Sequence, residues 1–167
     1  MLGARTVRRQ PRLNVMSTST NRIRPIAIGV IWRDGHLLVQ HGIDPDTGVP
    51  FFRPPGGAIE FGERAADALR REFMEELEAE LADVRLVTVL ENPFSYKGID
   101  YHEIVFVFEA QFADRRLYER DTFTLQETRV QATASWKDLD ELGRVEAPLY
   151  PGGLMHVLRN RLADIPV

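Results

Sequence analysis

The sequence predicts an α+β domain that combines several short strands with two amphipathic helices. Three observations support this prediction. Runs of β-branched and aromatic residues recur along the chain between segments that contain glycine and proline. Residues 62–81 are rich in Ala, Leu, Arg and Glu and contain no glycine or proline after Gly62, which favours a helix. A second amphipathic segment follows Pro151-Gly152-Gly153 and predicts a helix near the end of the chain.

The N-terminal half begins with a predicted hairpin. Two apolar runs, residues 26–32 and 36–40, flank Asp34-Gly35, a dipeptide typical of two-residue hairpin turns. The next segments are expected to form a surface loop, a short strand, a break and another short strand, over residues 42–50, 51–53, 54–57 and 58–61.

The predicted helix over residues 62–81 carries one apolar stripe. Ala66, Leu69, Phe73 and Leu77 recur at intervals of three, four and four residues, so they lie on one side of the helix. We expect this side to face the core.

Two strands are predicted after the helix, over residues 84–90 and 102–112. The second is apolar on both faces, so both strands are expected inside a covered sheet. Residues 91–101 between them contain proline, glycine and three aromatic residues, which indicates a loop above a pocket. Residues 122–130 and 131–136 are weaker strand candidates. The final helix is expected to bury the face shared by Leu154, Val157, Leu158 and Leu162.

Composition excludes several classes of protein. The chain has 167 residues, 44% hydrophobic and 28% charged, which suits one core. No apolar run approaches the roughly 18 residues that a membrane span needs, so no membrane partner is expected and a cytoplasmic location is the default. The absence of cysteine excludes disulfides and zinc–thiolate sites. The net charge of −4 argues against a nucleic-acid partner.

The first part of the chain differs from the rest. Residues 1–33 carry seven arginines and no carboxylate, and they lack the apolar stretch of a secretory signal. We expect residues 1–21 to be a disordered extension and residues 22–167 to form the domain. A transit peptide and a nucleic-acid-binding tail are the alternatives.

Three carboxylates share one arc of the predicted helix. At about 100° per residue, Glu76 lies about 40° to one side of Glu72, and Glu75 lies about 60° to the other side. Clustered hard oxygen donors suit Mg²⁺ or Mn²⁺. The alternative interpretation is a solvated charged face, because runs of acidic residues are common on surface helices.

The spacing around this arc resembles the Nudix box, the signature of the Nudix hydrolase family. Gly57 is followed after five residues by Glu63 and, after seven more, by a segment that starts at Arg71-Glu72 and includes Glu75-Glu76. The family's pattern then has a glycine where this chain has Glu78, and this departure predicts a longer helix. Over residues 24–163, the resemblance implies an α/β/α sandwich, with a curved mixed β-sheet between the Nudix helix and the C-terminal helix.

The resemblance also implies a reaction, the hydrolysis of a pyrophosphate bond in a nucleoside diphosphate linked to another group. Mg²⁺ is the implied cofactor, with Mn²⁺ as the alternative. Glu72 and Glu76 are the implied metal ligands, and Glu75 is a ligand or the base that activates water. The backbone carbonyl of Gly57 is a further implied ligand. Arg71 is expected to orient a carboxylate.

Residues outside this arc have weaker expected roles. Glu63 lies about 180° from Glu72 on an ideal helix, so it is expected to support the loop or the helix start. The candidates for an additional base are Glu103 and Glu127. Arg53 could meet a phosphate, and Tyr101, Phe94 or Tyr96 could stack a base. Core or surface packing is the alternative for each.

Two other functions remain open at this stage. A Nudix-fold module could bind a nucleotide or a protein without hydrolysing anything, because fold does not fix function. The basic start of the chain would suit a pyrophosphohydrolase acting on RNA 5′ ends, although it lacks an aromatic stacking platform. The expected partner is a small nucleotide, its identity is undetermined, and the chain could be a monomer or a homodimer.

Overall fold

The computed structural model describes residues 22–44, 47–96, 98–126, 132–142, 144, 146 and 148–163. The N-terminal extension expected over residues 1–21 lies outside these ranges. The strands are β1 (Ile23–Val30), β2 (Trp32–Arg33), β3 (His36–Ile43), β4 (Pro50–Arg53), β5 (Gly56–Ala58), β6 (Leu81–Tyr96), β7 (Ile99–Phe112), β8 (Thr122–Leu125) and β9 (Ala132–Asp138). The helices are α1 (Ala65–Leu77), the 3-10 helix η1 (Arg115–Glu119) and α2 (Leu154–Ala163). Among the described residues, no helix has the length and apolar character needed to cross a membrane.

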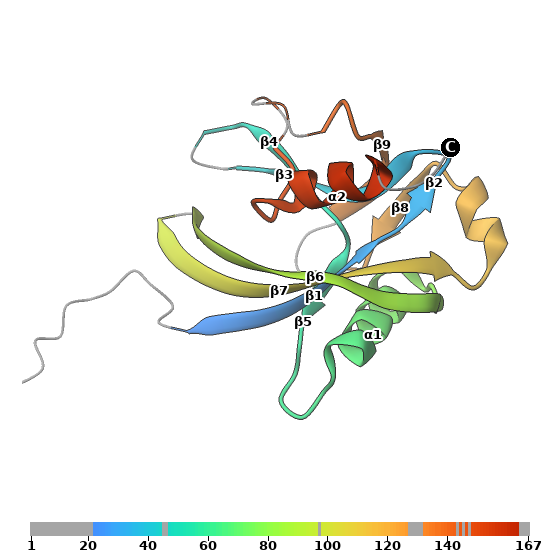
Figure 1. Cartoon of the computed structure of the whole chain (residues 1–167), viewed down its shortest axis with the longest axis horizontal. Coiled ribbons are helices and arrows are strands. Elements are labelled where there is room, and N and C mark those ends of the chain that lie inside the picture. Colours follow the sequence, from blue (N-terminus) through green and yellow to red (C-terminus); the bar gives the residue numbers. More distant parts are fainter. Residues whose placement is uncertain are drawn as a thin grey trace, which may run out of the picture.

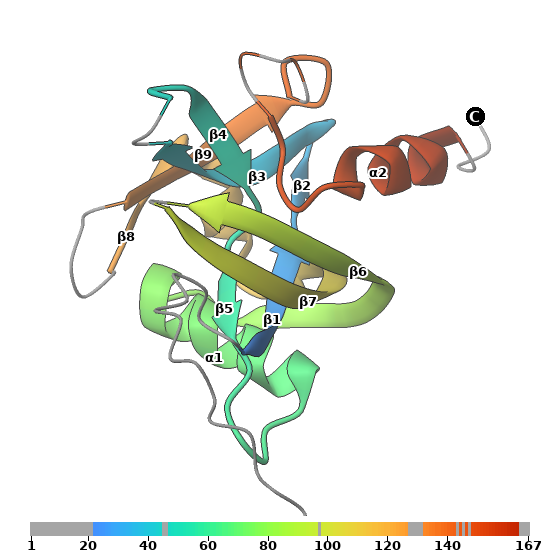
Figure 2. The same cartoon turned by 90° about the vertical axis from the view of Figure 1, so that its left-hand side faces the viewer.

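The strands form two sheets that lie between the two α-helices (Figures 1 and 2). The first sheet has the order β5-β1-β7-β6 and is mixed, because β1 and β7 run parallel. The second has the order β2-β3-β9-β8, with β4 also paired to β3, and its neighbouring strands run antiparallel. The predicted α+β class and the α/β/α sandwich are therefore confirmed.

From Ile26 to Val30, strand β1 is buried on both faces and separates two cores. Ala27 packs into the core beneath α1, together with Ile31 just beyond the strand. Ile26, Ile28 and Val30 pack into the core beneath α2. A central strand with helices on both sides needs this continuous apolar run.

The predicted hairpin is confirmed only at its turn. Asp34 and Gly35 have φ values of 48° and 80°, as a type I′ turn requires, and they join β2 to β3. The run over residues 26–32 is not one strand, however. The chain passes from the first sheet to the second at Ile31, whose carbonyl accepts a hydrogen bond from the Leu38 amide at 3.0 Å.

The loop predicted over residues 91–101 is wrong, because β6 and β7 continue through it as one long hairpin that turns at Gly98. Phe94 and Tyr101 are directly opposite each other and their rings stack with centroids 5.1 Å apart. Such cross-strand aromatic pairs stabilise a ladder, so the same residues that indicated a pocket loop extend the strands. Strand β7 is central, as predicted, whereas β6 lies at the edge of the described sheet.

Other boundaries also differ from the predictions. Strand β5 begins at Gly56, inside the predicted break, because its backbone pairs with β1. Strand β8 occupies part of the first weak strand segment, while β9 begins in the second and extends beyond it to Asp138. Residues 127–131 lie outside the described ranges. Helix α2 buries Leu154 and Leu158 as predicted and leaves Val157 partly exposed, while the side chain of Leu162 is not described.

Helix α1 is shorter than the predicted helix. It ends at Leu77 because Glu78 adopts a left-handed conformation, with φ 52° and ψ 40°. The longer helix predicted from Glu78 is therefore wrong. A left-handed non-glycine residue costs roughly 1–2 kcal/mol. Hydrogen bonds offset this cost: Gln126 donates its amide N–H to the Glu76 carbonyl and its side-chain amide to the Glu78 carboxylate, both at 3.1 Å.

The apolar stripe of α1 faces the first sheet, as predicted. Leu69, Phe73 and Leu77 are buried, and Ala66 is partly buried against the same core. The Phe73 ring lies directly over Gly29 of β1. A Cβ added at Gly29 would come within 2.7 Å of that ring, so only glycine fits there without a shift of the helix.

We expect Gly29→Ala to lower the free energy of unfolding by about 1–3 kcal/mol, because it overpacks the contact between β1 and Phe73. Urea denaturation followed by circular dichroism measures this change. Gly152→Ala is the matched control, since a Cβ there meets nothing within 4 Å. Equal stability of the two variants would show that Phe73 does not need the space over Gly29.

Candidate active site

Strand β5 brings its backbone directly against the acidic side of α1. Gly57 pairs with Ala27 of β1, and a Cβ added at Gly57 would lie 2.3 Å from the carboxylate carbon of Glu72. The missing side chain therefore lets the Gly57 backbone approach this carboxylate.

Arg71 connects the separate parts of the site. Its guanidinium binds Glu63 in a bidentate pair, with Nε donating to Oε1 and Nη2 donating to Oε2, both at 3.0 Å. Nη1 donates to Glu72 at 2.9 Å and to Glu75 at 3.2 Å, and Nη2 also donates to the Ala58 carbonyl at 2.9 Å. Forked charge-assisted hydrogen bonds of this kind fix orientation as well as position.

Glu63 lies before the helix, not on it. Residue Arg64 caps α1 with an extended backbone, so Glu63 leaves the helical spiral and its carboxylate reaches Arg71 eight residues later. The same carboxylate accepts a hydrogen bond from the Glu60 amide at 3.1 Å, which closes the loop before the helix.

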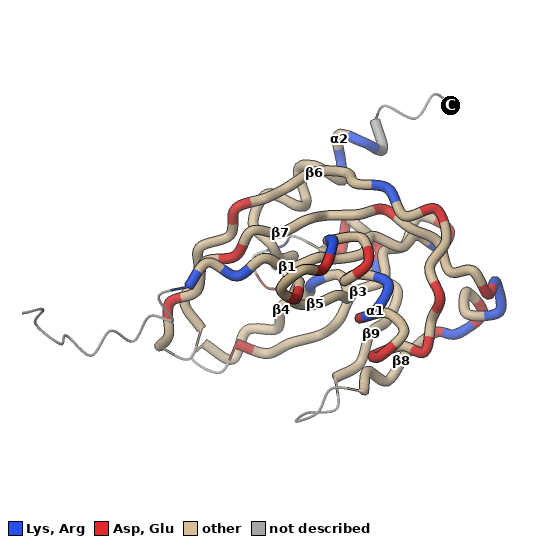
Figure 3. Tube along the Cα trace, turned by 90° about the horizontal axis from the view of Figure 1, so that it is seen from below, with Lys and Arg blue, Asp and Glu red and all other residues tan. Residues whose placement is uncertain are grey.

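The charges in this cluster stabilise one another. Hydrogen bonding to Glu63, followed by that to Glu72 and Glu75, raises the pKa of Arg71 well above its ordinary value. The hydrogen bond from Arg71, followed by that from the Glu60 backbone, lowers the pKa of Glu63. Figure 3 shows acidic and basic positions close together along α1 and the loop before it.

The three carboxylates of the arc differ in exposure. The Glu72 side chain is 14% exposed and the Glu75 side chain is 59% exposed. Glu76 is partly buried, with its Oε2 atom shielded from solvent. One arc of α1 therefore carries one exposed and two largely covered carboxylates.

The donor set fits a hard divalent cation. Carboxylates and a backbone carbonyl are the ligands that Mg²⁺ and Mn²⁺ prefer. Because Gly57 has no side chain, its backbone can lie close enough to the Glu72 carboxylate for both to bind one cation. Within the described ranges, no three acidic or histidine side chains already converge on one point. One oxygen of Glu72 and one of Glu75 each accept a hydrogen bond from Arg71.

The structure does not bring the two expected substrate-binding residues into contact with each other. Arg53 of β4 contacts β5 one residue before Gly57, where its Nη2 donates to the Gly56 carbonyl at 3.3 Å. Tyr101 stacks on Phe94 in the β6–β7 hairpin, with the Arg24 guanidinium 5.6 Å from its ring centroid.

The two candidates for an additional base are also separate from the arc. Glu103 is 5% exposed and accepts a long hydrogen bond of 3.4 Å from Asn92. It shares a face of β7 with Val105 and Val107, which belong to the core beneath α2, so it does not face α1. Glu127 lies outside the described residues.

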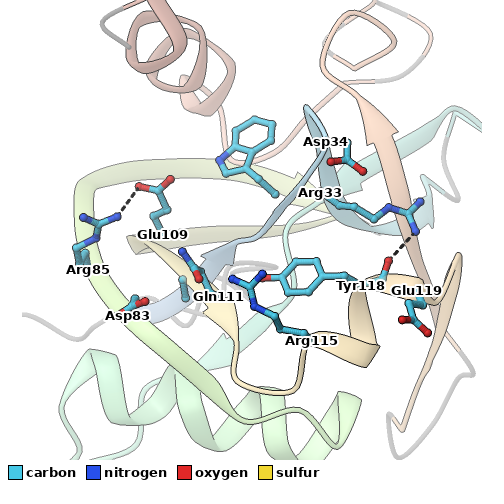
Figure 4. A pocket seen from close by; sticks show the side chains of 11 residues that line it. Arg33, Asp34, Asp83, Arg85, Glu109, Gln111, Arg115, Tyr118 and Glu119 are labelled. Carbon is cyan, nitrogen blue, oxygen red and sulfur yellow. Dashed lines mark hydrogen bonds and ion pairs between the residues drawn. The ribbon is translucent and has the colours of Figure 1, made fainter. Parts of the chain in front are cut away.

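A cleft of about 410 Å³ lies elsewhere, beside β6, β7 and η1, and no residue of the Gly57–Glu76 arrangement lines it (Figure 4). Several of its charges already have partners: Arg33 donates to the Tyr118 carbonyl at 3.1 Å, and Arg85 pairs with Glu109 at 3.9 Å. The candidate active site is therefore at α1 and β5, not in this cleft.

Sequence reasoning missed two contributors to the site. The Ala58 carbonyl carries no side-chain signal, and Gln126 is distant in sequence from the helix end that it binds.

The fold and the site define a class of protein. It is an α/β/α sandwich in which a strand that contains glycines lies against a helix that carries carboxylates. A family model described as the NUDIX domain matches residues 23–155. The chain belongs to the Nudix family, whose hydrolases act on nucleoside diphosphates linked to other groups.

Solved structures support the fold. The chain is 24% identical to the Escherichia coli ORF135 protein, with a TM-score of 0.56, and the match covers 87% of this chain and 95% of that one. A MutT NUDIX hydrolase from Burkholderia pseudomallei is 23% identical, with a TM-score of 0.56 and coverage of 87% and 100%. A NUDIX hydrolase from Nitrosomonas europaea is 22% identical, with a TM-score of 0.58 and coverage of 85% and 90%. A comparison with curated proteins found no match.

We expect Glu63→Gln to lower the melting temperature at pH 7, because it removes the bidentate partner of Arg71. Since folding lowers the pKa of Glu63, its stabilisation is present above the unfolded pKa of about 4.3 and is lost as pH falls through the lower folded pKa. The difference from the native chain should therefore shrink below about pH 4.3.

Thermal melts at pH 7, 4 and 3 test this expectation. Glu80→Gln is the control, because Glu80 is exposed and carries the same charge change outside the cluster. A difference between the Glu63 variant and the native chain that stays constant with pH would contradict the pairing with Arg71.

Proposed function

We propose that this chain hydrolyses a phosphoric anhydride bond in a nucleoside diphosphate linked to another group, with Mg²⁺ as cofactor and Mn²⁺ as the alternative. The observation that supports this most strongly is the Arg71 cluster, which binds Glu72 and Glu75 and includes the carboxylate of Glu72 that lies against the Gly57 backbone. The proposed catalytic domain comprises residues 22–167, and a small nucleotide is the proposed partner.

Two or three side chains and one backbone carbonyl would hold the cation. Glu72 and Glu76 are the proposed side-chain ligands, the Gly57 carbonyl is a further ligand, and Glu75 is either a ligand or the base. When bound, a divalent cation neutralises charge on the diphosphate and lowers the pKa of a coordinated water.

The different exposures of Glu72 and Glu75 support different roles for these two carboxylates. Glu75 is 59% exposed, so it can reach solvent and accept a proton from the attacking water. Glu72 is 14% exposed and held by Arg71, which suits a ligand that must keep its position. As water forms a bond to one phosphorus, the anhydride P–O bond breaks and the second phosphoryl group leaves with its oxygen.

Arg53 is the proposed phosphate contact. Its guanidinium donates to the Gly56 carbonyl, one residue from Gly57, and brings a positive charge to β5 at that point. A planar guanidinium suits recognition of phosphate oxygens. Tyr101 remains a proposal for stacking, at a site beyond the direct contacts of the arc.

We expect Glu72→Gln and Glu76→Gln each to reduce turnover at least about a hundredfold while the protein remains folded. Each variant loses a negatively charged ligand but keeps the size of the side chain. The assay measures phosphate and product release from ADP-ribose, dinucleoside polyphosphates and nucleotide sugars, with Mg²⁺, with Mn²⁺ and with EDTA.

Glu80→Gln serves as the matched control, since it makes the same change just beyond α1 at an exposed position. Circular dichroism verifies the fold of each variant. Near-normal turnover by a folded Glu72 or Glu76 variant would refute the proposed ligand set. Metal-independent binding without turnover by the native chain would support the non-catalytic module instead.

A further inference from the structure

The end of α1 is bound to the second sheet at Gln126. Helix α1 ends at Leu77, and carbonyls in the last turn of a helix have no partner within the helix itself. The Glu76 carbonyl accepts a hydrogen bond from the Gln126 amide at 3.1 Å. The Gln126 side chain also donates from Nε2 to the Glu78 carboxylate at 3.1 Å. Gln126 therefore binds the helix end at two positions, one on each side of Leu77.

The packing of β8 fixes the position of Gln126. Gln126 directly follows β8, in which Phe123 and Leu125 are buried. Both side chains belong to the core beneath α1, in the same cluster as Leu77. Side chains in a close-packed core move little, so the backbone that follows Leu125 keeps its place relative to the helix.

Glu76 lies where a helix most needs such support. Glu72 and Glu75 accept hydrogen bonds from Arg71. Glu76 is the next to last residue of α1, and the ends of helices fray. The hydrogen bond from Gln126 to the Glu76 carbonyl holds the backbone from which the Glu76 carboxylate extends.

The residue at position 78 gives Gln126 its second contact. The family's pattern has a glycine here, which adopts the left-handed conformation easily but has no side chain to accept a hydrogen bond. Glu78 adopts the same conformation, with φ 52° and ψ 40°, at a cost in free energy. Its carboxylate in return accepts the Gln126 side-chain amide. The departure from the pattern therefore adds a contact that holds the last turn of α1.

We propose that Gln126 is a positioning residue that keeps the Glu76 carboxylate in the arc with Glu72, ready to bind a divalent cation. It acts through the end of α1, by its contacts with the Glu76 carbonyl and the Glu78 side chain. This inference rests on the proposed function, in which Glu72 and Glu76 are metal ligands. Groups that orient a ligand without touching the metal typically change metal affinity by about 10–100-fold when they are removed.

Direct binding of Mn²⁺ tests this role without requiring hydrolysis. Free Mn²⁺ is measured by electron paramagnetic resonance, well below the melting temperature, for the native chain, Gln126→Leu and Gln126→Pro. Leucine removes the side-chain donor and keeps the backbone amide, whereas proline removes both donors. We expect the Kd for Mn²⁺ to rise about threefold in the leucine variant and about tenfold in the proline variant.

A double-mutant cycle shows whether Gln126 acts through Glu76. When either Gln126 change is added to Glu76→Gln, it should cause no further loss of Mn²⁺ affinity, because the ligand that it positions is already absent. Gln111→Leu is the matched control, since it makes the same change at an exposed position of β7. This control should keep the native Kd.

Melting temperature and turnover separate positioning from a purely structural role. A purely structural role would lower the melting temperature and leave the Kd of the folded protein unchanged. Circular dichroism follows the melting of Gln126→Leu, and turnover is measured over a range of Mg²⁺ concentrations. We expect the Mg²⁺ concentration for half-maximal turnover to rise about threefold, while kcat at saturating Mg²⁺ stays within about twofold of the native value.

A native Kd for Mn²⁺ in folded Gln126→Leu would overturn the inference, and so would an equal loss of affinity with and without the Glu76 carboxylate. If Mn²⁺ binding weakens as expected but no nucleotide is hydrolysed, the proposed function fails and the role of Gln126 stands. If hydrolysis depends on Mg²⁺ and the Gln126 variants keep the native Kd, only the role of Gln126 fails. A native chain that binds no Mn²⁺ would refute both the ligand set and the role of Gln126.

Discussion

One guanidinium determines how the pieces of this site fit together. Arg71 is bound to a carboxylate from the loop, to two carboxylates of α1 and to the end of β5 through the Ala58 carbonyl. Glu63, Glu72 and Glu75 would repel one another without it. Because its partners come from the loop, from α1 and from β5, this cation sets the distance between the helix and the glycine strand. The loop before the helix, the start of α1 and the position of Gly57 all depend on that distance.

The two sheets contribute different parts of the site around this cluster. The first sheet supplies β5 and supports the apolar stripe of α1, so it fixes the carboxylate arc. The second sheet supplies Arg53, whose guanidinium donates to the Gly56 carbonyl, next to Gly57 in the chain. The chain changes sheets at Ile31, immediately after β1. The proposed phosphate contact therefore lies on a different sheet from the strand that carries Gly57.

Features that depend on local spacing were predictable from the sequence. The apolar stripe through Leu69 and Phe73, the carboxylate arc and the Asp34-Gly35 turn follow from residues a few positions apart. Features that depend on distant pairing were not. The end of α1 depends on Gln126, and the long β6–β7 hairpin depends on cross-strand pairs. The composition of each segment taken alone therefore predicted a longer helix past Glu78 and a loop over residues 91–101. The Arg71 cluster needed Glu63 to leave the helix, which an ideal helical projection cannot show.

The left-handed residue at the end of α1, Glu78, helps to connect the helix to the second sheet. Glu78 and Glu76 are both tied to Gln126, which directly follows β8 in the second sheet. A small displacement of β8 would therefore act on the last turn of α1 through two hydrogen bonds, and that turn carries Glu76. A glycine at position 78 would relax the backbone more cheaply but would lose the carboxylate that anchors the Gln126 side chain. In this chain, two hydrogen bonds from Gln126 connect the second sheet to the acidic helix. They do so at the end of α1, where the family's pattern has a flexible glycine in place of Glu78.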